Sequence, residues 1–111
     1  MNKLDKLMNE LGHPDNIRGT RYLRAAVQDY RPGMSITKEL YPGIAKAEGT
    51  TASRVERAMR HSIDRAWERG NIDAQQKWFG YSVDPRKGRP TVGEYVARMA
   101  RICDEGTMDE N

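Results

Sequence analysis

The sequence predicts an all-α domain of about six helices built around a helix-turn-helix. Apolar residues recur at three- and four-residue spacing in several segments, as they do on one face of a helix. No segment alternates apolar and polar residues as a strand does, and glycine or proline separates the periodic segments. With 111 residues, of which 37% are hydrophobic, the chain is long enough for one small core and too short for a second.

The first two helices are expected over residues 3–11 and 17–30. Gly12 and Pro14 end the first, and His13 falls in the turn between them, where a turn role is favoured over metal binding because no cysteine or second histidine is near. On the second helix, Arg18, Arg21 and Arg24 advance by threes, and either phosphate contact or simple solvation would explain them. The apolar positions of the first helix are Leu4, Leu7, Met8 and Leu11, and those of the second are Tyr22, Leu23, Ala26, Val27 and Tyr30.

Two short helices are expected next. Ser35 caps the first, which runs to Leu40, and Tyr41 is expected to leave helical geometry because it precedes a proline. The second spans residues 42–48, with Pro42 in its first turn and Gly49 in the left-handed conformation that ends it.

The longest helix is expected over residues 52–69, between a Thr50–Thr51 start signal and a stop at Gly70. At 100° per residue, one side of it is a core seam of Ala52, Val55, Met59, Ser62, Ile63 and Ala66. The opposite side is polar and carries Ser53, Arg57, Arg60, His61 and Asp64, flanked by Arg54 and Glu56.

A short helix, a three-residue turn and a long amphipathic helix have the spacing of a helix-turn-helix. The arrangement would be winged-helix-like but without clear strands. By spacing alone, a DNA reader and an ordinary helical hairpin with a solvated charged face both remain open.

The last part of the domain is expected to hold two helices and a basic loop. Asp73 caps a helix over residues 74–79 that Gly80 ends, and Thr91 with Glu94 forms a capping box for the final helix. The aromatic side chains of Trp67, Trp78 and Phe79 are expected to seal the core. Between these helices the loop 84–90 carries Arg86, Lys87 and Arg89. Residues 1–103 thus form the domain, and residues 104–111 form an acidic, flexible tail.

The net charge of the whole chain is +3. The domain is more basic than this, since residues 1–103 hold 19 basic and 12 acidic groups, a balance of +7. A basic body favours a polyanionic partner, either nucleic acid or an acidic protein. No apolar run is long enough for a membrane span or a signal peptide, so a cytoplasmic protein is expected, and it would be nucleoid-associated if the polyanion is DNA. The single Cys103 excludes an internal disulfide and a multi-cysteine zinc site, and no cofactor is expected.

An enzyme is not expected. The only candidate for catalysis is His61 with Asp64 or Glu68, which lack a nucleophile and an oxyanion donor.

Specific residues then identify a family. The run LYPGIAKAEGTTASRVERAMRHSIDRAWERGNID, followed by FGYSV, resembles the effector domain of the sporulation-initiation response regulator, the stage zero sporulation protein A family. LGHPDNIRGTRYLRAAV and SITKELYP resemble the same domain, so the likeness covers Leu4 to Ala100. It implies a sequence-specific, double-stranded DNA-binding transcription regulator.

The resemblance and the chemistry of DNA reading together assign contact residues. Arginine donates two hydrogen bonds to guanine and glutamate accepts one from cytosine, and both are needed near the front of the recognition helix. The predicted base contacts are Arg54, Glu56, Arg57, Arg60 and His61. The predicted phosphate contacts are Thr50, Thr51, Ser53, Lys38, Lys46, Arg86, Lys87 and Arg89.

The resemblance also implies activation through RNA polymerase and its sigma factor. Gly70, Phe79 and Val83 match the family's region for this contact, whereas Ala74 stands where the family has serine. The alternative for Gly70 and Phe79 is a helix stop and a core aromatic residue.

In the resembled family a phosphorylatable receiver precedes the effector, whereas this chain begins almost directly at the effector's first helix. We therefore expect DNA binding that needs no phosphorylation, by a weak monomer or a DNA-induced dimer. A competitor for a full-length regulator's sites and a module for an acidic protein partner are the alternatives.

Overall fold

The structure, a computed structural model, describes residues 2–80 and 88–104. These residues form six α-helices and one short π-helix, with no β-strand among them, which confirms the predicted all-α fold. The helices are α1 (Lys3–Leu11), α2 (Arg18–Asp29), η1 (Ile36–Leu40, the π-helix), α3 (Tyr41–Glu48), α4 (Ala52–Arg69), α5 (Ile72–Phe79) and α6 (Val92–Asp104).

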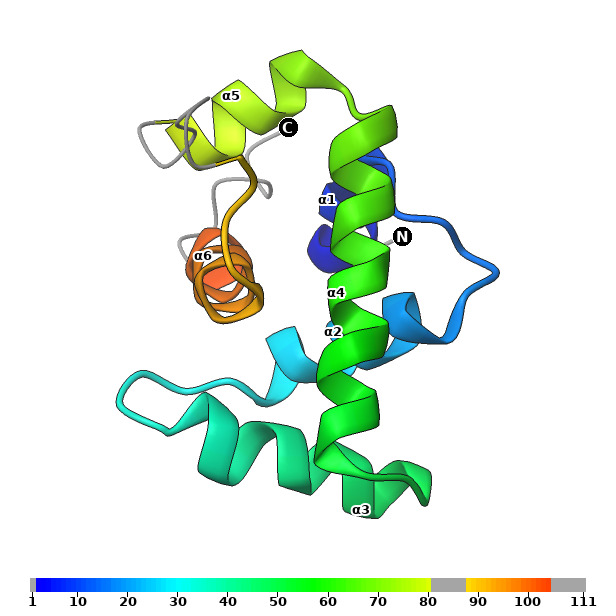
Figure 1. The fold of residues 1–111 in the computed structure, drawn as a ribbon. Helices are drawn as coiled ribbons and strands as arrows, with labels where there is room; N and C mark the ends of the chain where they lie inside the picture. The colour runs from blue at the N-terminus through cyan, green and yellow to red at the C-terminus, as the bar shows by residue number, and fades with distance from the viewer. Residues whose placement is uncertain (1, 81–87, 105–111) are drawn as a thin grey trace.

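The long helix α4 organises the fold (Figure 1). Helix α3 lies at its N-terminal end and α5 follows its C-terminal end, while α1 and α2 lie behind it in this view and α6 lies to one side. The predicted core seam is confirmed, because Val55, Met59 and Ile63 are 0% exposed. The polar side of α4 therefore stays at the surface while its apolar side is fixed in the core.

Aromatic residues close the core around the rear half of α4, as predicted. Phe79 stacks on Tyr95 of α6 with ring centroids 4.7 Å apart, and Trp67 meets Phe79 edge to face at 5.7 Å. The buried Trp78 donates its indole N–H to the Glu10 carboxylate over 3.0 Å. These contacts join α1, α4, α5 and α6.

Several predicted caps are confirmed. The Ser35 and Thr51 hydroxyls accept from the N–H groups of Lys38 and Arg54. Thr91 and Glu94 exchange two hydrogen bonds of 2.9 and 3.1 Å, which is the capping box expected before α6.

Three predicted boundaries are wrong. Tyr41 does not leave helical geometry: its φ of −62° and ψ of −45° are helical, and η1 runs directly into α3. The α5 cap is Asn71, whose side chain accepts from the Ala74 N–H, so Asp73 lies in the first turn. Asp104 is the last residue of α6 and not the start of the tail. The rest of the predicted tail, 105–111, lies outside the described residues.

Gly19 sets the close approach of α2 to α4. A Cβ atom at this position would lie 1.9 Å from the carbonyl oxygen of Ala58 and 3.2 Å from Cβ of Ser62. The distance to the Ala58 oxygen is far shorter than any contact between non-bonded heavy atoms. Only glycine therefore lets the first turn of α2 lie this close to the backbone of α4.

A buried polar network also holds α4 from behind. His13 lies in the turn after α1, as predicted, but its ring is buried. Its Nδ1 lies 2.9 Å from Oγ of Ser62, and its Nε2 lies 2.7 Å from the Tyr95 hydroxyl. Thr20 Oγ1 lies 2.8 Å from the same Ser62 oxygen. The network joins the α1–α2 turn, α2, α4 and α6, and it fixes the rotation of α4 about its axis.

Burial of His13 makes stability depend on pH. Desolvation, with a smaller contribution from the Arg24 charge, lowers the pKa of His13 from 6.5 to about 4. The unfolded chain then binds more protons than the folded one between these values, so stability is complete above about pH 6.5 and is lost as the pH falls toward 4. We expect a loss of about 3 kcal/mol over this range, measured by urea unfolding.

The matched variant is His13→Gln, which keeps polar groups in the network and does not titrate. Carboxylates titrate in the same range in both proteins, so the difference between their pH profiles isolates His13. Parallel profiles for the parent and the variant would contradict this assignment.

Candidate nucleic-acid interface

The turn between α3 and α4 has the geometry predicted for a helix-turn-helix. Gly49 ends α3 in the left-handed conformation, with φ of 68°, and its N–H donates to the Ala45 carbonyl. On α3, Tyr41, Ile44 and Ala45 are buried, so this helix braces α4 from the core side. An ion pair of 2.8 Å between Arg21 and Glu48 ties α3 to α2.

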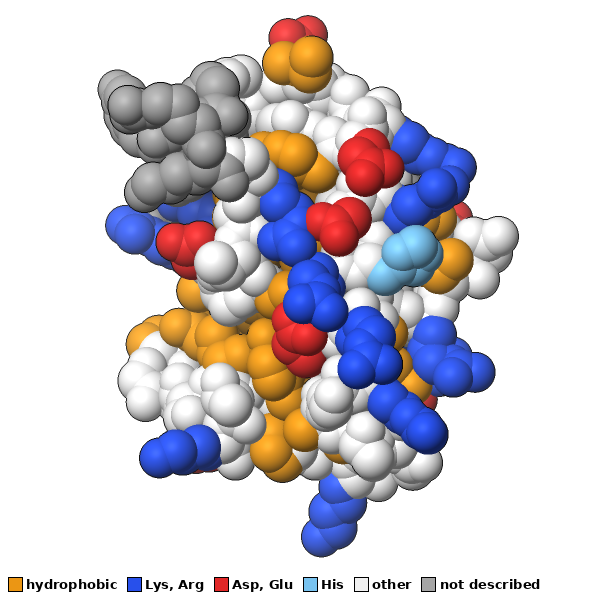
Figure 2. Space-filling view, in the orientation of Figure 1, with side chains coloured by type: hydrophobic (Ala, Val, Ile, Leu, Met, Phe, Trp, Pro, Cys, Tyr) orange, Lys and Arg blue, Asp and Glu red, His pale blue; other side chains and the backbone are white. Residues whose placement is uncertain are grey.

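The face of α4 that points away from the core carries most of the predicted base contacts. Arg54, Arg57, Arg60 and His61 are all exposed, and so is Ser53. Figure 2 shows Lys and Arg side chains in a row along this face, with a His side chain beside them. Long donors therefore project from the first ten residues of the helix, which is the part that enters a groove in helix-turn-helix proteins.

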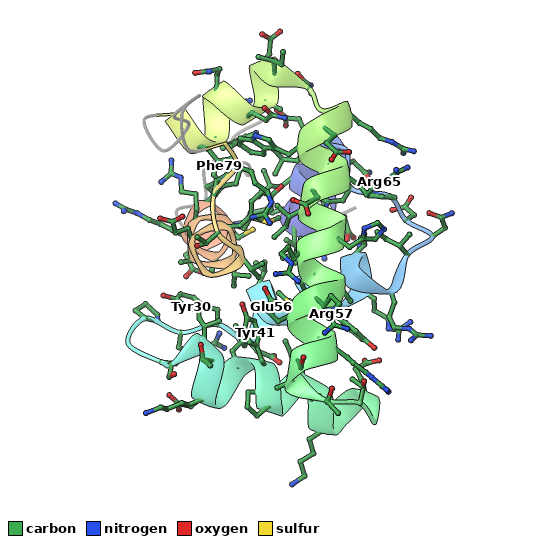
Figure 3. The ribbon with its side chains drawn as sticks, viewed as in Figure 1. Tyr30, Tyr41, Glu56, Arg57, Arg65 and Phe79 are labelled. Carbon is green, nitrogen blue, oxygen red and sulfur yellow. The ribbon has the colours of Figure 1, made fainter. Side chains whose placement is uncertain are left out.

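Glu56 lies apart from the arginines. It leaves α4 on the side where Tyr41 lies, whereas Arg57 lies nearer the other side (Figure 3). Its side chain is 32% exposed and its carboxylate is 3.7 Å from the Arg60 guanidinium. Burial, and then the charge of Glu56, raise the pKa of the Tyr41 hydroxyl. The structure thus brings Glu56 and Arg60 together on one flank and leaves Arg54, Arg57 and His61 on the other.

Arg89, a predicted phosphate contact, has partners within the chain. Its Nε pairs with the Asp64 carboxylate on α4, and its NH1 donates to the Pro90 carbonyl over 2.7 Å. The side chain is only 23% exposed. This pair joins the segment before α6 to the middle of α4 and neutralises Asp64 on the outward face.

The other predicted phosphate contacts divide between described and undescribed residues. Thr51, Ser53, Lys38 and Lys46 are exposed and Thr50 is half-buried, all around the N-terminal end of α4 or on η1 and α3. Arg86 and Lys87 lie outside the described residues.

Of the predicted polymerase contacts, only Gly70 and Phe79 lie within the described residues. Phe79 is 2% exposed, with its ring in the core, and Val83 lies outside the described residues. A Cβ on Gly70 would lie 2.0 Å from Nε2 of Gln75, an amide that donates to the Trp67 carbonyl. The same Cβ would lie 2.7 Å from the Ala66 carbonyl oxygen, a backbone atom, so packing against the end of α4 explains glycine at this position.

Residues 2–80 and 88–104 contain neither a metal-binding cluster nor a membrane-spanning helix. No group of three or more His, Cys, Asp or Glu side chains there is arranged to hold a metal ion. In the same residues, no helix is both long and apolar enough to cross a lipid bilayer.

Sequence reasoning missed the internal partners of His13 and Arg89. The His13 ring meets residues 49 and 82 positions away, and Arg89 meets a residue 25 positions away. A histidine directly after a helix-ending glycine gives no local sign of such partners. Only the apolar surroundings of Ser62 on the predicted seam hinted that a polar partner would be needed there.

A braced short helix, a glycine turn and a long helix with an arginine-rich front define a helix-turn-helix domain of the DNA-binding class. A family model described as Sporulation initiation factor Spo0A C terminal matches residues 4–102 of the chain. The chain belongs to this family, which confirms the resemblance seen in the sequence. The family is a DNA-binding effector domain of a response regulator that controls transcription in sporulation, and it is not an enzyme family.

Proposed function

We propose that this domain reads a specific sequence of double-stranded DNA by placing the N-terminal half of α4 in the major groove. The observation that carries the proposal is the exposed set Arg54, Arg57, Arg60 and His61 on the front of a helix whose back is fixed in the core. A major groove about 12 Å wide admits one helix. Helix α4 is about 27 Å long, so its N-terminal half can enter the groove while its C-terminal half stays anchored in the domain.

The two flanks of α4 suit different base edges. Arg57 and Arg54 supply paired donors for guanine, and Glu56 supplies an acceptor for the amino group of cytosine. Because Glu56 already lies near Arg60, the two side chains are pre-ordered relative to each other before DNA arrives. We propose that these residues, with His61, read the operator box of the family.

Phosphate contacts position the helix without reading sequence. We propose Thr50, Thr51, Ser53, Lys38 and Lys46 for this role, with Arg86 and Lys87 from the basic loop. Arg89 is engaged with Asp64, so its contribution is to hold that loop's end against α4. On this proposal the 111 residues bind without a phosphodonor, and regulation of transcription follows from occupancy of the operator.

The test is an electrophoretic shift with a duplex carrying the family's box and a scrambled duplex of equal length. We expect tighter binding of the box, and a log K that falls steeply with log salt, with a slope near 0.9 per phosphate contacted. Equal affinity for the two duplexes would contradict sequence-specific reading and leave only non-specific DNA binding, whereas failure to bind either duplex would contradict DNA binding and favour an acidic protein as the partner.

A further inference from the structure

A depression in the surface lies between the first turn of α2 and the front of α4. It measures about 440 Å³, and its walls include Arg18 and Tyr22 from α2 and Arg54, Arg57 and His61 from α4. Thr50, from the turn before α4, also contributes to it. Helices α2 and α4, which are far apart in sequence, thus bring three guanidinium groups and an imidazole to the same surface depression.

The close approach at Gly19 creates this juxtaposition. At Gly19, α2 lies against the α4 backbone at Ala58. Arg18, the residue before Gly19, is therefore placed beside the flank of α4 that carries Arg54 and Arg57. On α4, Arg57 and His61 are four residues apart and so lie one above the other on that flank.

The charges at this depression are not neutralised within the described chain. On α2, Arg21 pairs with Glu48 and Arg24 with Asp5. Among residues 2–80 and 88–104, neither Arg18, Arg54 nor Arg57 has an ion-pair partner, and no carboxylate is among the lining residues. Like charges that line one depression without a counter-charge destabilise the free domain slightly, which an anion would relieve.

The start of α2 adds to the positive potential. Its N-cap residue, Ile17, provides no side-chain hydrogen bond to the first turn, where the Thr20 N–H donates to the Ile17 carbonyl over 3.2 Å, so no capping side chain competes with an anion at the start of this 12-residue helix. Helix N-termini favour negative charge.

We propose that this depression is a phosphodiester site, in which Arg18 binds the DNA backbone beside the major groove while Arg54 and Arg57 turn toward the bases. The inference rests on the proposed function and extends it, because it adds α2 to the interface. Arg18 is thereby distinguished from Arg21 and Arg24, which have the same spacing but serve as internal ties.

The test compares the salt dependence of binding for the parent, Arg18→Gln and Arg18→Lys, on the box duplex and on the scrambled duplex. We expect Arg18→Gln to lower the slope of log K against log salt by about 1 on both duplexes, because a phosphate contact is independent of sequence. Arg18→Lys keeps the charge and is expected to keep the slope. Arg31→Gln, an exposed arginine at the other end of α2, is the matched control and should behave as the parent does.

The outcomes separate the two proposals. Suppose the parent prefers the box, but Arg18→Gln keeps the parent's salt slope or lowers it no more than Arg31→Gln does. The proposal of a phosphodiester site is then wrong, and the base-reading role of α4 stands. If the parent itself does not distinguish the duplexes, the proposed function fails, whatever Arg18 does.

Discussion

Replacing Gly19 by alanine is expected to destabilise the domain by about 3 kcal/mol, the upper part of the range for overpacking a core. The added Cβ would lie 1.9 Å from a backbone oxygen of α4, and backbone cannot rotate away as a side chain can. Helices α2 and α4 must separate, which also strains the hydrogen bonds of Thr20 and His13 to Ser62. Urea unfolding followed by circular dichroism measures the change.

The control is Gly43→Ala. Gly43 lies within α3, has a negative φ, and a Cβ there would meet no heavy atom within 4 Å. Alanine should therefore stabilise the domain by up to about 1 kcal/mol through the usual helix preference. If Gly19→Ala were as stable as the parent, the described packing of α2 on α4 would be wrong.

Replacing Arg57 by alanine is expected to remove most of the discrimination between the box and a scrambled duplex. A two-donor contact to guanine contributes about 1–3 kcal/mol of discrimination, which corresponds to a loss of roughly fivefold to 150-fold in the affinity ratio. Arg57 is exposed and has no ion-pair partner among the described residues, so its loss should leave folding unchanged. Fluorescence anisotropy with both duplexes measures the ratio.

Arg69→Ala is the control on the same helix. Arg69 is exposed in the last turn of α4, too far along to reach base edges, so its loss should weaken binding to both duplexes alike or not at all. A ratio that falls as far for Arg69→Ala as for Arg57→Ala would mean that the charge of α4, and not its contact with bases, sets the affinity.

Local patterns were enough to predict the helix that carries the site. The 52–69 boundaries, the Thr51 cap, the left-handed Gly49 and the buried seam all follow from periodicity and capping, which act over a few residues. The exposed polar side of α4 follows from the same spacing of 100° per residue, because the side opposite a buried seam faces solvent.

What the sequence did not predict depends on contacts between distant residues. Tyr41 stays helical despite the following proline because its side chain is buried, and tertiary packing outweighs the local preference. His13 and Arg89 find partners on other helices that no local pattern indicates. Similarly, Arg18, Arg21 and Arg24 look alike in sequence, and only the positions of Glu48 and Asp5 tell them apart.

The central claim is that the outward arginines of α4 contact base edges in the major groove. It is tested most directly with a box duplex in which guanine is replaced by 7-deazaguanine, which removes the N7 acceptor while leaving the phosphates and the minor groove unchanged. We expect the parent to bind this duplex about tenfold or more weakly than the natural box, and Arg57→Ala, which keeps Arg54, to show a clearly smaller difference between the two. Equal binding of both duplexes by the parent would contradict the claim and leave α4 as a helix that contacts only the backbone.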